Sequence, residues 1–428
     1  MHPTLNRSDT FSFLTLTSTG QDTVSLRLSA DLFDRASVHE TALSNLLPDL
    51  LLSGAGSYDR AGFLRAMNQL GGNLQLTMSD GVLHLTLLVG THTYPKALGL
   101  VRTMLEAPSF TSSEFARAIA SARNELAEAV DDSRQQAVDA LHRSCFSRHS
   151  RQYRPPLSQI KTALGKVTEA DVQALYQRLQ ESFWYVSVAG PDSAHSTTER
   201  VLKRLRPAPT LRPLRPAQDQ LAYERTLTLI DLPSRQNIDL AIGRPLPLTL
   251  DDPTFPAFAF GSHVLGKPGG FAGRLMQTVR EKHGLTYGIY AQPAHATRTT
   301  TGLWQLRTFF HPSQVIVGLD ATWTELRKLY ARGITAHEHE QFQTILATSD
   351  ILVRDSAHQY LKELHQYHRL DYNLEEQATF KESLRTVSRH AVNEAIKQYL
   401  DPTQLSVAGA GPIHAVQSEI DAWFARMA

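Results

Sequence analysis

The sequence repeats a pattern of helix followed by strand at a distance of about 220 residues, and this repeat limits the possible folds more than any other feature. The first copy has GKVTEADVQALYQRL (165–179) and then FWYVSVAGP (183–191), and the second has RTVSRHAVNEAIKQYL (385–400) and then QLSVAGAGP (404–412). Upstream of these segments, VDDS at 130–133 corresponds to VRDS at 353–356, 223 residues later. Nearly equal offsets over such a distance predict a duplicated domain.

The local pattern of each copy predicts its secondary structure. Thr168 and Ser388 carry hydroxyl groups that can cap a helix, and apolar residues follow at helical spacing. Strand-like runs occur at Val82–Val89 and Gly302–Phe310, beside helical stretches of a dozen residues or more, and VDDS and VRDS each lie inside such a stretch. This mixture of elements predicts an α+β fold.

A proline-rich segment at the midpoint divides the two copies. Residues 206–217, RPAPTLRPLRPA, contain four prolines. Proline fixes φ and removes a backbone donor, so this segment is predicted to be an extended, semi-rigid linker. We therefore expect an N-terminal domain at 1–205 and a C-terminal domain at 218–428.

Composition gives no sign of a nucleic-acid or membrane partner, although a local basic groove stays possible. Lys and Arg number 43 and Asp and Glu number 42, so the net charge is +1 and gives no overall attraction to nucleic acid or to an anionic membrane. No apolar run approaches the roughly 18 residues that span a bilayer. Cys145 is the single cysteine, so no intramolecular disulfide can form. The first residues lack a signal-peptide pattern, so we expect the cytoplasm, or the periplasm if a leader was removed.

Residues 261–291, GSHVLGKPGGFAGRLMQTVREKHGLTYGIYA, carry the most specific signal in the chain. They closely resemble the second-half signature of the pitrilysin/insulinase family, the inverzincins, in which a glycine-bearing loop precedes a helix of the form SRL…REK and G-L-x-Y then opens a strand. The local residues agree, because Gly284 suits a helix end and LTYGIYA is β-prone. The resemblance extends over most of the chain, including 60–85, 97–130 and 151–175. It implies two homologous domains, each a mostly antiparallel sheet packed with helices, arranged as a half-clamshell.

The zinc motif of active family members is degraded here. Those members carry H-x-x-E-H on a first-half helix, in which the histidines bind zinc and the glutamate is the general base, and a further glutamate is the third ligand. The matching helix is ETALSNLLPDLLLSGAG (40–56). Its alignment places Asn45 and Asp49 at the histidine positions, Pro48 at the position of the base, and Glu125 at the third ligand position.

These replacements predict that the chain holds neither a metal nor another cofactor. Asparagine is a poor zinc ligand, and Pro48 should also kink or shorten the helix. Asp49 and Glu125 could alternatively hold a harder cation such as calcium. The predicted edge strand departs from the family as well, because Gln75-Leu76-Thr77-Met78 stands where Asn-Ala-x-Thr is frequent.

Arg280 and Tyr287 match the arginine and tyrosine of the family signature, and the resemblance assigns them the catalytic role. In active members this pair faces the zinc, where the arginine grips the substrate backbone and the tyrosine stabilises the tetrahedral oxyanion. The loop at 266–273, with Gly269, Gly270 and Phe271, is predicted to help capture substrate. A plain surface arginine with a half-buried strand tyrosine, and a plain loop before a helix, are the alternatives.

A chain with the pair but without zinc fits one subunit of a heterodimeric peptidase. The resemblance implies a zinc-bearing H-x-x-E-H subunit of the same family as partner, and a peptide or peptide precursor as substrate, bound by addition to a sheet edge. The alternatives are a purely structural family member and a self-sufficient enzyme with an unforeseen metal.

The remaining histidines and the cysteine predict structural roles. His358, His365 and His368 share one face of a predicted amphipathic helix with Leu361 and Leu364. Cys145 has histidines three residues before and four after it, but no orienting residue or nucleophile turn accompanies them, so a structural cysteine is expected.

Overall fold

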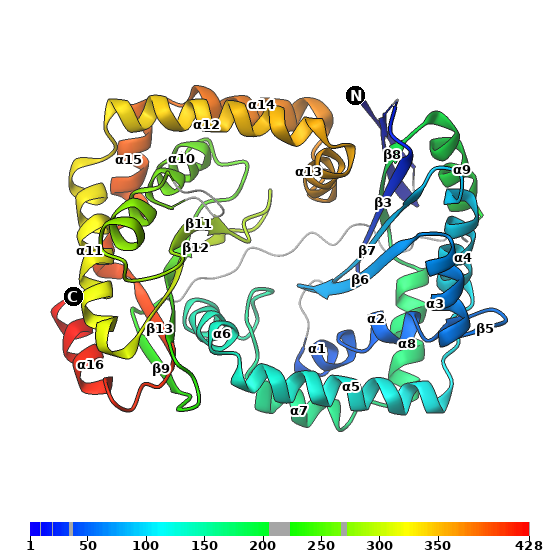
Figure 1. Cartoon of the computed structure of the whole chain (residues 1–428), viewed down its shortest axis with the longest axis horizontal. Helices are drawn as coiled ribbons and strands as arrows, with labels where there is room; N and C mark the ends of the chain where they lie inside the picture. The colour runs from blue at the N-terminus through cyan, green and yellow to red at the C-terminus, as the bar shows by residue number, and fades with distance from the viewer. Residues whose placement is uncertain (9, 19, 34–36, 205–222, 267–271, 428) are drawn as a thin grey trace. The chain divides into compact units, whose positions relative to one another are not determined.

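The computed structural model describes residues 1–428 apart from 9, 19, 34–36, 205–222, 267–271 and 428, so the predicted linker at 206–217 lies outside the described residues. The chain forms two compact units (Figure 1). Unit 1 comprises Met1–Leu126, Leu157–Arg215 and Ser349–Ala378, and unit 2 comprises Ala127–Pro156, Pro216–Thr348 and Thr379–Ala428. Each unit thus takes most of its residues from one half of the sequence and a helical segment from the other half.

Unit 1 is built on a six-stranded sheet with the strand order β1-β2-β8-β3-β7-β6. Neighbouring strands are antiparallel except β2 and β8, which are parallel. The strands are β1 His2–Arg7, β2 Phe11–Thr17, β3 Thr23–Asp31, β6 Asn73–Ser79, β7 Val82–Gly90 and β8 Trp184–Gly190. The strand predicted at Val82–Val89 is confirmed, because β7 pairs with β3 over its whole length.

The helices of unit 1 cover both faces of this sheet. They are α1 Val38–Ser44, α2 Leu47–Leu51, α3 Arg60–Gln69, α4 Tyr94–Glu106, α5 Ser112–Asp131, α7 Leu157–Leu164, α8 Glu169–Gln180, α9 Asp192–Leu202 and α13 Ala357–Arg369. The short strands β4 Gly54–Ala55 and β5 Tyr58–Asp59 pair between α2 and α3. Helices α4 and α9 pack against one face, and α13 packs against β8, β3 and β2 on the other.

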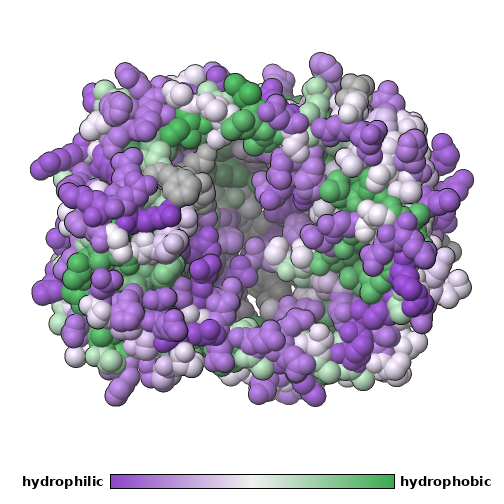
Figure 2. Space-filling view, viewed as in Figure 1, coloured by the Kyte–Doolittle hydropathy of each residue, from purple (hydrophilic) through white to green (hydrophobic). Residues whose placement is uncertain are grey.

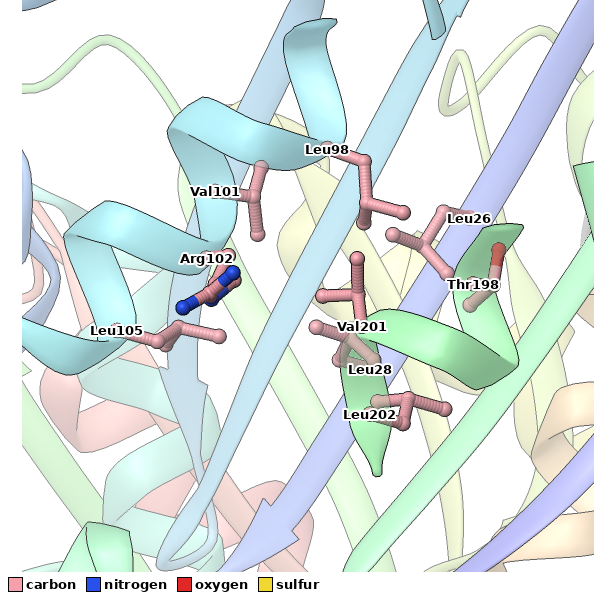
Figure 3. A pocket seen from close by; sticks show the side chains of 9 residues that line it. All are labelled: Leu26, Leu28, Leu98, Val101, Arg102, Leu105, Thr198, Val201 and Leu202. Atoms are coloured by element: carbon pink, nitrogen blue, oxygen red, sulfur yellow. The ribbon is translucent and has the colours of Figure 1, made fainter. Parts of the chain in front are cut away.

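A small void lies between the sheet, α4 and α9 (Figure 3). Its volume is about 10 Å³, about the space of a single water molecule. Its lining is almost entirely aliphatic and consists of Leu26, Leu28, Leu98, Val101, Arg102, Leu105, Thr198, Val201 and Leu202. It is therefore a packing void of the core and not a ligand site.

Unit 2 is built on a five-stranded sheet with the order β9-β13-β10-β12-β11. Its strands are β9 Leu227–Asp231, β10 Ile238–Leu246, β11 Tyr290–Ala294, β12 Gly302–Phe310 and β13 Ser406–Gly411. The pair β9 and β13 is parallel and the others are antiparallel. This order and these directions repeat β2-β8-β3-β7-β6 of unit 1, so the duplication predicted from the repeat is confirmed.

The helical elements of unit 2 also follow the pattern of unit 1. They are α6 Ser133–Cys145, α10 Phe255–Gly266, the π-helix η1 Met276–Lys282, η2 Pro312–Gln314, α11 Val315–Arg332, α12 Ala336–Asp355, α14 Leu374–Thr386, α15 Arg389–Tyr399, η3 Pro402–Gln404 and α16 Gln417–Arg426, of which α12 and α14 extend into unit 1. The predicted caps are confirmed: Thr168 accepts a hydrogen bond from the backbone of Asp171, and Ser388 accepts one from Ala391.

The repeated VDDS and VRDS motifs mark helix boundaries, which corrects the expectation that each lies inside a helix. Helix α5 ends at Asp131, and the Asp132 side chain caps α6 by accepting from the backbone of Gln135. Ser356 caps α13 in the same way after α12 ends at Asp355. Side-chain caps favour a new helix over continuation of the old one. After the first break, α6 packs on β13, β10 and β9 within unit 2, and after the second break, α13 packs on β8, β3 and β2 within unit 1.

The surface in view in Figure 2 is mostly hydrophilic, with several separate hydrophobic patches. Among the described residues, no helix combines the length and the apolar character that a membrane crossing requires.

Candidate functional site

The helix that aligns with the zinc motif is broken at the motif itself. Helix α1 ends at Ser44 with Asn45 as its C-cap, and the short helix α2 begins at Leu47 with Pro48 in its first turn. Proline is tolerated there because the first backbone donors of a helix have no intrahelical partner. The prediction that Pro48 interrupts this helix is confirmed.

Asp49 belongs to a closed ring of ion pairs within unit 1. Its two carboxylate oxygens accept from Arg60 Nη1 at 3.1 Å and from Arg117 Nη2 at 2.6 Å. Glu114 closes the ring, because its Oε2 lies 2.9 Å from Nε of both arginines. Arg60 Nη2 also donates to the backbone oxygen of Asp49 at 2.8 Å. The two carboxylates and two guanidinium groups balance in charge and tie α2 to α3 and α5.

These residues do not fit a zinc ion. Both oxygens of Asp49 are held by arginines, whose positive charges oppose a metal cation at the same place. Glu125 lies on α5 eight residues beyond Arg117, about 12 Å further along the helix axis, and it accepts from Ser121 Oγ at 3.2 Å. The arrangement also disfavours the alternative of a harder cation between Asp49 and Glu125. Within the described part of the chain, no group of three or more His, Cys, Asp or Glu side chains could hold a metal ion.

The predicted helix of the 261–291 signature is present in unit 2 and includes a π-helical turn. Its apolar face, predicted from Leu275, Met276 and Val279, is fully buried. Gly284 has φ of 64° and donates to the carbonyl of Arg280 at 2.8 Å, which confirms it as the residue that ends the helix. The next residue, Leu285, donates to the carbonyl of Val279. π-helical turns are rare in proteins, and those that do occur often lie at functional sites.

The structure brings the side chains of Arg280 and Tyr287 together. The central guanidinium carbon of Arg280 lies 5.5 Å from the centroid of the Tyr287 ring, a cation–π distance. The reversal at Gly284 makes this contact possible, because it returns the chain past the last turn of η1. Tyr287 is 81% exposed, the highest value among the large hydrophobic side chains that the structure describes.

The sequence predicted Tyr287 at the start of a strand, but in the structure this residue lies in a turn. The strand β11 begins three residues later, at Tyr290. The hydroxyl of Thr286 accepts from the backbone of Gly288 at 3.3 Å, which folds the chain locally. Gly288 leaves room for a neighbouring ring, because a Cβ there would lie 3.0 Å from Cε2 of Tyr290. Buried neighbours, Leu285 and Thr286, fix this turn and direct Tyr287 outward.

Other parts of the predicted substrate-binding surface differ in how far the structure describes them. Gly269, Gly270 and Phe271 lie outside the described residues. The predicted edge strand is β6, at the end of the sheet of unit 1, where it pairs with β7. Because β6 is the last strand of this sheet, one row of its backbone groups is not paired within the sheet, and its side chains alternate between exposed and partly buried.

Cys145 is a structural residue, as predicted. Its side chain is fully buried in a small cluster between α6 and the sheet of unit 2. Burial raises the pKa of the thiol to about 12, so the nucleophilic thiolate is essentially absent at neutral pH.

A row of buried polar groups lies between α13 and the sheet of unit 1. His358, His365 and His368 share the face of α13 that packs on the sheet, as predicted, but this face is not purely apolar. Ser29 Oγ lies 2.8 Å from His365 Nε2, and Ser187 Oγ lies 2.8 Å from His365 Nδ1. The sequence signal that could have indicated these contacts is the alternation of Ser25, Arg27 and Ser29 along β3.

Comparisons with known proteins agree with this fold and with the altered metal position. The family described as insulinase (peptidase family M16) matches residues 33–154, and the peptidase M16 inactive domain matches residues 166–346. A curated relative from Helicobacter pylori, called non-peptidase homolog YmxG, is 21% identical over 377 residues, which are 86% of this chain and 84% of the relative.

Two solved structures have the same fold. A peptidase M16 inactive domain from Pseudomonas fluorescens has a TM-score of 0.83 at 18% identity, with 96% of this chain and 98% of that chain covered. A protease from Helicobacter pylori has a TM-score of 0.81 at 11% identity, with 96% and 99% covered. Fold and site thus define a metallopeptidase-like protein whose metal position has been lost. The chain belongs to peptidase family M16, the insulinase family, and its sequence contains no H-x-x-E-H motif.

Proposed function

We propose that this chain is the catalytically incomplete subunit of a heterodimeric zinc peptidase. Arg280 and Tyr287 complete the active site of a zinc-bearing partner of the same family, and the substrate is a peptide or a peptide precursor. The observation that carries the proposal is the exposed Tyr287 ring beside Arg280, on a chain whose metal position is occupied by a ring of ion pairs.

The geometry of the pair suits the proposed chemistry. A tyrosine ring that is 81% exposed contributes little to the core of its own unit, so its conformation suits contact with another molecule. Its hydroxyl can donate to an oxygen that becomes negative in the transition state. Arg280 supplies several fixed donors for substrate carbonyl oxygens, and its charge beside the ring stabilises the tyrosine position. The zinc of the partner would supply the activated water.

The altered metal position supports a division of labour between two chains. No general base stands at position 48, and the charge at position 49 is neutralised by Arg60 and Arg117. A relative in the same family is named a non-peptidase homolog. We therefore expect no peptidase activity from this chain alone, with or without added zinc.

Reconstitution tests the proposal directly. The chain is purified from its native host together with any H-x-x-E-H protein that accompanies it, and peptide hydrolysis is measured for each chain alone and for the pair. Hydrolysis should require both chains. Tyr287→Phe in this chain should lower kcat of the pair by about 10²–10³-fold, the usual effect of a lost oxyanion donor. Tyr58→Phe is the matched control, because Tyr58 is also exposed but lies in unit 1, on β5.

Each negative result has a defined meaning. Full turnover with Tyr287→Phe would remove the catalytic role from that residue. A stable complex of the two chains without hydrolysis would favour the purely structural alternative. Chelator-sensitive hydrolysis by this chain alone would contradict the proposal as a whole.

A further inference from the structure

Arg307, on β12 of unit 2, is a partly buried cation without a partner among the residues that the structure describes. Among the residues that the structure describes, it makes no hydrogen bond, ion pair or ring contact. Every other partly buried arginine in the described ranges has at least one such interaction. Arg274, for example, is paired with Glu338, and Arg244 lies over the ring of Tyr223.

An unpaired guanidinium at such a position is unusual for physical reasons. Arginine stays charged at all physiological pH values, so it cannot avoid the cost of partial burial by losing a proton. Charged groups that are partly removed from water are commonly paired. The nitrogens of Arg307 are not among the buried side-chain atoms that lack a partner, so its guanidinium is accessible and free to pair with a bound molecule that carries a negative charge.

The strand register places Arg307 close to the proposed substrate-binding pair. Arg307 is directly opposite Tyr290 on the edge strand β11 and opposite Ala241 on β10. Residues directly opposite each other project to the same face of a sheet. Ala241 is buried in the cluster that α6 forms with this face. Helix α6 packs on β10, β13 and β9, and Arg307 lies on the next strand toward the edge.

The distance from Tyr287 can be bounded from the chain itself. Three residues separate Tyr287 from Tyr290, which is at most about 11 Å of extended chain, and the cross-strand step to Arg307 adds about 5 Å. An extended peptide rises about 3.3 Å per residue. A peptide whose scissile bond lies at Tyr287 therefore reaches Arg307 within about five residues.

We propose that Arg307 binds a carboxylate of the peptide substrate, within about five residues of the bond held at Arg280 and Tyr287. This inference rests on the proposed function and adds a specificity determinant to it. The planar guanidinium can donate two parallel hydrogen bonds to one carboxylate. The carboxylate is either an acidic side chain or the carboxyl terminus of the peptide.

Peptide binding to the full chain tests the inference without any peptidase activity. The probes are fluorescein-labelled 12-residue peptides of Ala, Thr and Leu with an amidated carboxyl terminus and one Glu at successive positions. A Gln series and a Gln peptide with a free carboxyl terminus separate the two sources of carboxylate. Dissociation constants are measured by fluorescence anisotropy at low and moderate salt. At the best position we expect Glu, or the free terminus, to bind about ten-fold more tightly than its neutral counterpart.

Three variants identify the residue responsible. Arg307→Gln should abolish the preference for the carboxylate, and Arg307→Lys should keep part of it, because a lysine keeps the charge but not the two-pronged geometry. Arg235→Gln is the charge-matched control, since Arg235 is exposed in the same unit, and it should leave the preference unchanged. Equal thermal unfolding of Arg307→Gln and the unmodified chain excludes a merely structural effect.

The outcomes separate this inference from the proposed function. Peptide binding without a carboxylate preference, or a preference that survives in Arg307→Gln, overturns the role of Arg307 and leaves the role of Tyr287 intact. Failure of all the peptides to bind, both to the chain alone and to its complex with a zinc-bearing partner, overturns peptide binding itself and both proposals with it.

Discussion

Lowering the pH below about 6.5 should loosen helix α13 from the sheet of unit 1. His368 Nε2 lies 2.7 Å from Ser12 Oγ, and His368 Nδ1 lies 3.1 Å from Ser187 Oγ, which also contacts His365. Burial lowers the pKa of His368 from 6.5 to about 3, with a further contribution from Arg7 on β1. Burial also lowers the pKa of His365 well below its usual value.

Every charged or titratable neighbour that acts on His365 works in the same direction. His368 on α13, Arg27 on β3, His84 on β7 and Arg369 on α13 all disfavour a proton on His365. Arg369 is partly offset by Asp31 at the end of β3, 3.8 Å away. The folded state therefore binds fewer protons than the unfolded state between pH 6.5 and about 3. The part of the free energy of unfolding that depends on neutral histidines is fully present above pH 6.5 and is lost as the pH falls.

The size of the effect follows from the pKa of His368. Each pH unit between the two pKa values changes the free energy of unfolding by about 1.4 kcal/mol per histidine. At pH 5.0, 1.5 units below the ordinary value, His368 alone should cost about 2 kcal/mol. His365 adds a loss of the same sign, so that the pair should cost more than His368 alone.

Hydrogen exchange resolved by mass spectrometry measures this effect where it occurs. Peptides that cover α13 are followed between pH 7.5 and 5.0, with correction for the intrinsic pH dependence of exchange, and peptides from α15, whose His390 is exposed, serve as internal reference. The free energy of opening of α13 should fall below pH 6.5, and that of α15 should change much less. A double variant, His365→Gln with His368→Gln, keeps hydrogen-bonding groups beside the serines but cannot titrate. Its pH dependence should be much flatter, whereas His337→Gln, at an exposed position, should behave as the unmodified chain.

The reasoning would be refuted by an opening free energy of α13 that stays constant from pH 6.5 to 5.0. It would also be refuted if the double variant kept the full pH dependence, because the protons would then bind elsewhere.

Two further predictions concern the lost metal position and the cysteine. Asp49→Ala should lower the free energy of unfolding by about 0.5–2 kcal/mol, because it breaks two partly exposed ion pairs and leaves two arginines close together. The control Glu106→Ala breaks one more exposed ion pair, with Arg102, and should lower it less. Urea denaturation measures both changes, and an unchanged midpoint for Asp49→Ala would show that the ring of ion pairs does not contribute to stability. Cys145 should react with a thiol reagent at pH 8 only after denaturation, since burial holds its pKa near 12, and rapid stoichiometric labelling of the native chain would contradict its buried position.

The sequence by itself determined the features that depend on local backbone preferences and on repetition. The repeat of about 220 residues predicted two copies of one fold, and the two sheets have the same strand order. As predicted, a hydroxyl group caps a helix at Thr168 and at Ser388, and a helix ends at Gly284. The helix that contains Pro48 is interrupted, also as predicted. These outcomes could be predicted because each depends on neighbours a few residues away in the chain.

The tertiary structure decided which distant residues meet. Asp49 and Arg117 are 68 residues apart in sequence, and Ser29 and His365 are 336 apart, yet each pair is in direct contact. The polar alternation along β3 does not say that α13 is the helix that covers it, and no pattern indicates that Arg307 lacks a partner among the described residues, because both depend on which elements the folded chain brings together. The spacing of Arg280 and Tyr287 was visible in the sequence, but their contact required the reversal at Gly284 and the buried turn that follows it.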